Sequence, residues 1–213
     1  MKYRLHLSYL LIAIFCLLLG GCSGSSSASR KEHSGPPRDS TPKVLTPSAD
    51  GVTVYQNDLA SIDASNTSQG YVMVKYNGTN EKVKLQITCP DQSCYTYLIS
   101  DRGAYDTFPL TAGNGSYALQ VLENVAGDTY TVSLAQSINV NIEDEFLPFL
   151  YPNQYVNFHT DSKAVSKGSD LAKDTYSDLD VVQNIYNYVI KNISYDTEKA
   201  QNVSYGYVPD IDD

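Results

Sequence analysis

Alternating apolar and polar positions run through residues 51–142 of this 213-residue chain. In "KVKLQIT", Val83, Leu85 and Ile87 fall on one side of an extended chain and polar residues fall on the other, as a strand with one buried face requires. Similar runs occur at near-regular spacing: VTVYQ, GYVMVKYNG, KVKLQIT, YTYLIS, YDTFPLT, GSYALQVLEN and DTYTVSLAQSINVNI. Turn residues such as Asn77-Gly78 separate them. The pattern therefore predicts seven strands that form a β-sandwich.

The segment "LTAGNGSYALQV" makes the fold prediction more specific. A tight turn precedes Tyr117, and the segment resembles the part of immunoglobulin-like modules in which a tyrosine enters a strand after such a turn. We therefore expect the Tyr117 hydroxyl to bond the backbone upstream. A unit of roughly 90 residues is also the usual size of these modules. The predicted fold is mainly β, with an immunoglobulin-like β-sandwich over residues 50–143.

A helical period replaces the alternation over residues 177–193. Apolar side chains recur every three or four positions and share one broad face, which consists of Leu179, Val182, Ile185, Tyr186, Val189, Ile190 and Ile193. Ser177 and Asp180 have the spacing of a capping box at its start. A helix of this length is marginal alone in water. Its apolar face therefore needs a partner, and in this sequence only residues 194–213 follow it.

Two prolines and a group of aromatic residues interrupt both patterns between residues 144 and 176. We interpret this segment as a connector. Its aromatic side chains are Phe146, Phe149, Tyr151 and Tyr155. Aromatic residues beside prolines in a connector more often pack one domain against the next, which is the interpretation we favour. A sugar-binding face is the alternative.

The N-terminal residues predict export. Lys2 and Arg4 precede the apolar run "LSYLLIAIFCLLL", which is shorter than the ~20 apolar residues of a membrane-spanning helix. We therefore assign residues 1–21 to a signal peptide. The stretch "LGGC" that ends at Cys22 resembles the bacterial lipobox, in which the cysteine is lipidated on sulfur and becomes the mature N-terminus. The alternative is an ordinary signal peptide with an incidental cysteine.

Residues 22–49 are rich in Ser and Pro and nearly free of large apolar side chains. This composition predicts a disordered tether that spans roughly 30 Å as a flexible coil. Two acyl chains on one cysteine suffice for stable membrane anchoring. We therefore expect a protein that its lipid holds on the extracytoplasmic face of the cell membrane.

Acidic residues outnumber basic ones. The formal net charge is −9, and removal of a signal peptide with two basic and no acidic residues lowers it by two to −11. Such a surface repels a polyanion, and no basic stretch with interleaved aromatics compensates, so we expect no nucleic-acid partner. The acidic groups at 143–145 and 210–213 lack the ligand spacing of a calcium loop. We interpret both as solvated charge and expect neither a metal nor a cofactor.

Cys89 and Cys94 remain once the signal peptide and Cys22 are set aside. They flank "PDQS", which begins with the turn residues Pro-Asp. In an exported protein this even pair predicts a disulfide across the mouth of a hairpin. Two free thiols are the alternative. A metal site is least favoured because no histidine or further cysteine joins the pair.

The stretch "DLDVVQNIYNYVIKNISYDTEKA" resembles the first helix of transglutaminase-like domains, which belong to the papain-like superfamily of thiol enzymes. The upstream "EDEFLPFLYPNQYVNF", behind a predicted sandwich and a lipobox, looks like the preceding part of bacterial lipoproteins with that domain. The specific similarity covers about the last third of the chain. It implies that residues 177–213 begin such an α+β domain, and that the parent protein acts on amide bonds by thiol acyl transfer or hydrolysis.

No catalytic residue of that family is carried over to this chain. In the family, the nucleophilic cysteine follows this helix in a Gly-x-Cys setting, and a histidine and an aspartate come later. Here no cysteine follows Cys94, and the mature histidines are His33 and His159. His159 with Asp161 offers a base and an orienting group without a nucleophile nearby in sequence, so we favour an exposed loop histidine. We therefore expect a catalytically inert chain that holds an incomplete domain.

A binding module is the rival to an incomplete enzyme. The chain contains 18 tyrosines and no tryptophan, and tyrosine suits both sheet faces and recognition surfaces. On this hypothesis the sandwich recognises a cell-wall polymer or a protein partner. Composition does not separate the two. The chain is expected to be either the non-catalytic N-terminal part of a transglutaminase-like lipoprotein or a stand-alone surface binding module.

Overall fold

The computed structural model of the protein describes residues 35–204 and 206–213. The chain divides into two compact units, Met1–Pro36 and Pro37–Asp213, and all elements below belong to the second. The predicted signal peptide, Cys22 and the first part of the predicted tether lie outside the described residues.

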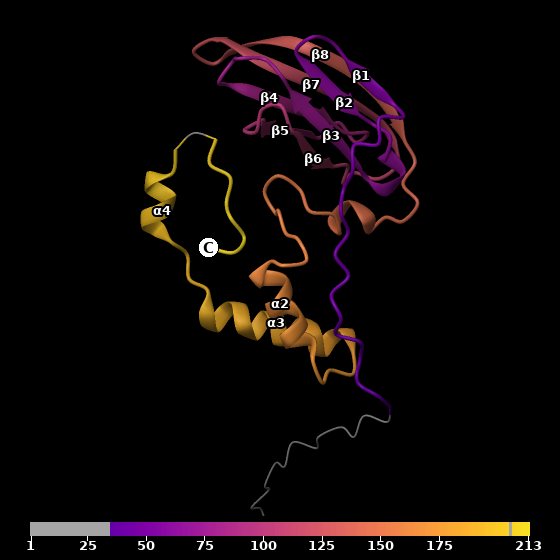
Figure 1. The fold of residues 1–213 in the computed structure, drawn as a ribbon, viewed down its shortest axis with the longest axis vertical. Coiled ribbons are helices and arrows are strands. Elements are labelled where there is room, and N and C mark those ends of the chain that lie inside the picture. Colours follow the sequence, from indigo (N-terminus) through magenta and orange to yellow (C-terminus); the bar gives the residue numbers. More distant parts are fainter. Residues whose placement is uncertain (1–34, 205) are drawn as a thin grey trace, which may run out of the picture. The chain divides into compact units, whose positions relative to one another are not determined.

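Eight strands make up most of the regular structure between residues 54 and 140 (Figure 1). They are β1 (Val54–Gln56), β2 (Ala60–Asp63), β3 (Tyr71–Tyr76), β4 (Val83–Thr88), β5 (Cys94–Leu98), β6 (Tyr105–Pro109), β7 (Gly115–Ala126) and β8 (Thr129–Val140). One four-stranded sheet has the order β1-β2-β3-β6 and the other has the order β5-β4-β7-β8. Every pairing is antiparallel. The prediction of a mainly β fold is therefore confirmed, and we call these strands the β body.

The alternation in the sequence explains the core of the β body. Along β4 the side chains of Val83, Leu85 and Ile87 are buried, and those between them are half-buried. Neighbouring strands contribute in the same way, so residues of both sheets join one hydrophobic cluster. The largest fully buried side chains in this cluster are Tyr76, Tyr117, Phe108, Ile62, Leu85, Ile87, Leu110 and Leu119. Burial of one face of each sheet supplies the main favourable free energy of this fold.

Strand β2 was not expected from the sequence. Its four residues, Ala60–Asp63, are all buried, although Ser61 and Asp63 are polar. The Asp63 carboxylate accepts hydrogen bonds from Gly51 N at 2.7 Å and from Ser65 N at 2.9 Å. These bonds compensate the desolvation of the carboxylate, so a short polar segment lies inside a sheet.

Tyr117 lies at the start of β7, and its side chain is completely buried. Its hydroxyl accepts a hydrogen bond from Ala112 N at 3.1 Å and donates one to Gly113 O at 2.8 Å. Both partners are backbone atoms upstream in the chain. The predicted backbone bonding by Tyr117 is therefore confirmed.

The connector packs partly on the β body. Tyr151 lies 4.7 Å from Tyr71, measured between ring centroids, and Tyr155 stacks on Tyr97 at 6.2 Å. Phe146 precedes the short 3-10 helix η2 (Leu147–Phe149) and Phe149 ends it, and both side chains are largely exposed. The packing interpretation thus holds for the two tyrosines but not for the two phenylalanines.

Close approach of the connector to the β body depends on a glycine. Gly70 follows the short 3-10 helix η1 (Thr67–Gln69) and has a φ of +81°. A Cβ atom at this position would lie 2.4 Å from Pro148 Cγ. Glycine is therefore required here both for the left-handed backbone and for the contact with η2.

Three helices follow η2: α2 (Lys163–Ala172), which lies inside the predicted connector 144–176, α3 (Asp178–Asn192) and α4 (Thr197–Asn202) (Figure 1). The expected helix is α3, and its capping box is present, because Asp180 N donates to Ser177 Oγ and Ser177 N donates to the Asp180 carboxylate. Helices α2 and α4 were not expected. At the start of α2 the Ser162 side chain makes no capping bond, and Ala164 N donates instead to Asp212 Oδ1 at 3.1 Å.

The part of the predicted tether that the structure describes makes specific contacts. Arg38 N donates to Thr175 O at 2.8 Å, and the Arg38 guanidinium lies 2.7 Å from the Asp178 carboxylate. Farther along, Ser48 N donates to the Tyr71 hydroxyl at 3.1 Å. This part of the chain is therefore not the free coil that we expected, because its backbone and side-chain polar groups form hydrogen bonds and an ion pair with residues elsewhere in the structure.

Candidate functional site

The apolar face of α3 is exposed. We define the α3 apolar face as the seven residues that share the helical stripe. Their side chains retain between 40 and 73% of their accessible surface, and they are Leu179, Val182, Ile185, Tyr186, Val189, Ile190 and Ile193. Contiguous exposed apolar surface is unusual on a monomeric domain and marks interaction sites. The expectation of an apolar face in need of a partner agrees with this geometry.

Helix α3 contacts α2 through a different set of side chains. Asn184 Nδ2 donates to Leu171 O at 2.9 Å, and Lys167 Nζ lies 5.3 Å from the centroid of the Tyr188 ring. Residues 184 and 188 are one turn apart, on a side of the helix that differs from the α3 apolar face. The contact with α2 therefore fixes one side of α3 and leaves its most apolar side uncovered.

Cys89 and Cys94 are both free thiols in the structure. In the β4–β5 hairpin Thr88 pairs with Cys94, while Cys89 N donates to Ser93 O. Adjacent residues of a strand point to opposite faces, so the Cys89 side chain is buried in the core and that of Cys94 is exposed. The disulfide expected from the sequence is absent because the register sends the two side chains to opposite faces.

We expect the two thiols to react at very different rates. Cys94 should be alkylated in the folded protein, whereas Cys89 should react only on unfolding, because it is buried and burial raises the pKa of its thiol. Alkylation with and without denaturant, followed by peptide mass mapping, measures both rates. A cross-linked Cys89–Cys94 peptide under non-reducing conditions would contradict this expectation.

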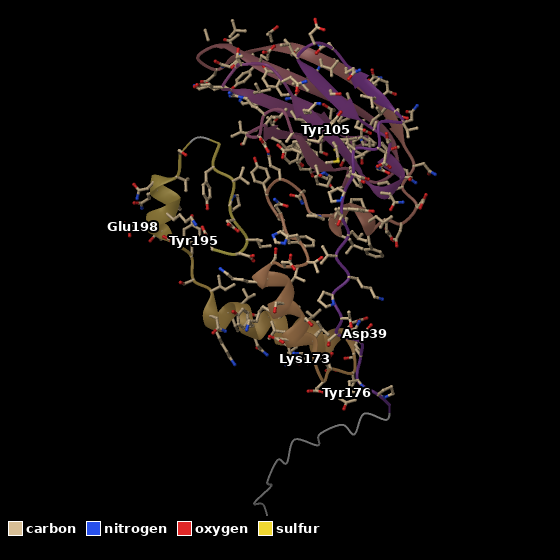
Figure 2. The ribbon with its side chains drawn as sticks, viewed as in Figure 1. Asp39, Tyr105, Lys173, Tyr176, Tyr195 and Glu198 are labelled. Atoms are coloured by element: carbon tan, nitrogen blue, oxygen red, sulfur yellow. The ribbon has the colours of Figure 1, made fainter. Side chains whose placement is uncertain are left out.

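A cavity of about 510 Å³ lies between the β body and the connector. Its wall includes Asp101, Tyr105, Asp106, Gln154 and His159. Tyr105, labelled in Figure 2, stands on the edge strand β6 and donates from its hydroxyl to Ser61 Oγ at 3.1 Å. A volume of this size is within the range of small-molecule sites. The cavity is therefore the second candidate site.

Gln154 joins the connector to both sheets at this cavity. Its backbone N donates to Thr107 O on β6 at 3.4 Å, and its side-chain Nε2 donates to Leu98 O at the end of β5 at 2.5 Å. The same Nε2 lies 3.3 Å from Asp106 Oδ2. The side chain is 7% exposed, and its Oε1 is buried without a hydrogen-bond partner among the described residues. Buried polar atoms of this kind are rare and call for an explanation.

Asp106 is the most strongly desolvated carboxylate at the cavity. Burial raises the pKa of Asp106, the nearby negative charge of Asp101 raises it further, and the bond from Gln154 opposes the shift. The folded protein therefore takes up a proton at Asp106 at a pH where the unfolded chain does not. Near neutral pH the charged Asp106 carboxylate lowers the stability of the folded state. As the pH falls through the raised folded pKa toward 3.8, Asp106 is protonated in the folded protein and the stability of that state increases.

Asp106→Asn is therefore expected to raise the Tm at pH 7. The amide keeps the shape and an acceptor for Gln154 but carries no charge to desolvate. The advantage should vanish below about pH 3.8, where the parent carboxylate is protonated as well. Thermal unfolding followed by circular dichroism at pH 7 and pH 3.5 measures it. A variant with a lower Tm than the parent at pH 7 would contradict the conclusion that the buried charge of Asp106 destabilises the folded protein.

His159 and Asp161 do not form a base and an orienting group. His159 Nδ1 accepts a hydrogen bond from Asp161 N at 3.3 Å, so the backbone of Asp161, and not its carboxylate, contacts the ring. No cysteine lines the cavity within the described residues. His159 is exposed and lies in a loop, in agreement with the interpretation favoured from the sequence.

The acidic C-terminal group makes specific contacts that the sequence did not indicate. Asp213 pairs with Lys199 Nζ at 2.9 Å, and Asp212 O accepts from Lys163 Nζ at 2.8 Å. Together with the Asp212 bond to the first turn of α2, these contacts tie residues 210–213 to the helices. The group therefore contacts the helices, while the Asp213 side chain stays largely exposed, as the expectation of solvated charge requires.

Over the part of the chain that the structure describes, no group of three or more His, Cys, Asp or Glu side chains is arranged to hold a metal ion. Among the same residues, none of the helices has both the length and the apolar character that crossing a membrane requires. Comparisons with protein-family models, with curated proteins and with solved structures each found no match. Functional inference therefore depends on the α3 apolar face, the cavity and the sequence patterns.

Proposed function

We propose that this chain is the non-catalytic, lipid-anchored N-terminal part of a transglutaminase-like protein, and that it presents the first helix of that domain outside the cytoplasm. The exposure of the α3 apolar face carries the proposal. A helix of 15 residues with this much exposed apolar surface gains stability when a partner covers it. The resemblance of this stretch to the first helix of transglutaminase-like domains supplies a partner, namely the remaining elements of such a domain.

On this proposal the β body is an immunoglobulin-like sandwich that holds the helical part away from the lipid. Three features support the assignment: two antiparallel sheets share one core, the connections β3–β4, β5–β6 and β6–β7 pass between sheets, and Tyr117 bonds the backbone upstream. The eight strands fall between the seven and the nine that such modules usually have. Lipidation of Cys22 would attach the assembly to the membrane.

Chemistry in the parent protein would be thiol acyl transfer or hydrolysis at amide bonds. A thiolate attacks the amide carbonyl, an imidazole accepts and returns the proton, and a third group orients the ring. None of these groups is assigned to a residue of this chain. Its contribution is to position the helix on which the catalytic domain packs.

Sequencing the coding region in frame beyond codon 213 and expressing the extended chain tests the proposal. We expect a Gly-x-Cys stretch followed by His and Asp, an iodoacetamide-reactive thiol at that cysteine, and slower amide exchange in α3 than in the 213-residue chain. A Cys→Ser variant at the new position is the matched control for the thiol. An in-frame stop at codon 214 in a protein whose α3 is already protected would overturn the proposal.

A stand-alone surface binding module is the second candidate function. The exposed side chains of Phe146, before η2, and Phe149, its last residue, favour it, because exposed aromatic residues suit recognition of a cell-wall polymer or a protein. Sedimentation with purified cell-wall sacculi tests it. Loss of co-sedimentation in a Phe146→Ala/Phe149→Ala variant would support the module, and equal sedimentation of the variant and the parent would count against it.

A further inference from the structure

We propose that the cavity between the β body and the connector binds a primary ammonium group carried by a small molecule. The inference is independent of the proposed function. It depends on the charge of the cavity wall, on the buried Gln154 oxygen that lacks a donor, and on the apolar side chains that line the rest of the cavity.

The charge of the cavity wall selects for a cation. The wall contains the carboxylates of Asp101 and Asp106, and it contains no lysine or arginine among the described residues. The two aspartates are close enough for the charge of one to raise the pKa of the other. A bound cation would compensate both charges at once, whereas a neutral ligand would leave Asp106 desolvated.

The oxygen atoms of the site match the donors of an ammonium group. Gln154 Oε1 is buried and lacks a donor within the described residues. Its orientation is fixed because Nε2 of the same amide donates to Leu98 O, and a flipped amide would place two oxygens against each other. With Asp101 and Asp106, this oxygen makes three acceptors, and an ammonium group has three N–H donors.

The remaining wall suits a short alkyl stem. Apolar and aromatic side chains from five separate segments line it, and they include Leu45, Met73, Tyr105, Phe158 and Val208. Polar oxygens at one side and apolar surface at the other are typical of sites for small organic ligands. A bare metal ion is disfavoured, because the described residues contain no cluster of three ligands for it. A small alkylammonium ligand therefore fits the wall better than an inorganic cation.

Titration of the full chain with Nα-acetyl-lysine methylamide, and with Nα-acetyl-norleucine methylamide as the uncharged control, tests the proposal. We expect the lysine compound to shift backbone amide resonances of residues 105–107 and 153–160 in ¹⁵N-edited NMR spectra, and the norleucine compound to shift none of them. Asp106→Asn should weaken binding about tenfold or more, since a charge-assisted bond is lost. Asp128→Asn removes the same charge in the β7–β8 turn, and binding to it should stay within about twofold of the parent.

Three results would overturn the proposal. The first is an absence of shifts at the cavity with the lysine compound, and the second is equal binding of both compounds. The third is an equal loss of binding in Asp106→Asn and Asp128→Asn, which would indicate general attraction to an acidic surface. The Tm of each variant, measured on the same samples, shows that a loss of binding does not arise from unfolding.

Discussion

Tyr117→Ala is expected to lower the free energy of unfolding by about 3–5 kcal/mol. The Tyr117 side chain is completely buried in the core of the β body, where it contributes apolar contacts and two hydrogen bonds to the backbone upstream. Removal of the ring leaves a cavity and two backbone groups without partners. Because a domain is stable by only about 5–15 kcal/mol, the loss would be a large fraction of the total. Urea denaturation followed by circular dichroism measures it.

Tyr117→Phe separates the hydroxyl from the ring. We expect a smaller loss of about 1–3 kcal/mol, because Ala112 N and Gly113 O become buried without a partner. Burial raises the pKa of the Tyr117 hydroxyl to about 12, so the hydroxyl is neutral at every pH used for the measurement. A Phe variant as stable as the parent would show that the corner bonds do not contribute.

Cys22→Ser is expected to remove the protein from the membrane fraction almost completely. The prediction comes from the lipobox resemblance, since Cys22 lies outside the described residues. Without the thiol no acyl chain is attached, and the chain loses the apolar contribution of about 0.8 kcal/mol per buried CH₂ group. Cell fractionation with a fatty-acid label measures both location and lipidation.

Cys16→Ser is the matched control for this experiment. Cys16 lies within the predicted signal peptide, so its replacement should leave both the label and the membrane fraction unchanged. Retention of the label in Cys22→Ser would mean that the lipid is attached elsewhere or that the signal peptide is not of the lipobox type.

Most of the β body could be predicted because its strands bury one face, and one-sided burial imposes alternation. Strand β2 was missed since it is short and completely buried, and one of the two backbone bonds that compensate its polar residue Asp63 comes from Gly51, twelve positions upstream. Helix α2 was missed for a similar reason, because its first turn is capped by Asp212 from the far end of the chain. Contacts between positions distant in sequence leave no local periodic signal.

The two candidate sites also differ in whether the local sequence pattern reveals them. The α3 apolar face was predicted because helical periodicity places its residues together whatever surrounds them. The cavity was not predicted, since its wall comes from residues near positions 45, 105, 154 and 208. No local sequence pattern around Gln154 indicates that it joins the connector to the two sheets. The Cys89–Cys94 disulfide was expected because the spacing of the two cysteines does not reveal the register of the hairpin.

Hydrogen exchange along the 213-residue chain tests most directly whether the α3 apolar face is uncovered. With light scattering confirming a monomer, we expect the amides of α3 to exchange through local opening, much faster than those of β4 and β7 in the core. Exchange of α3 as slow as that of β7 in a monomer would contradict the account.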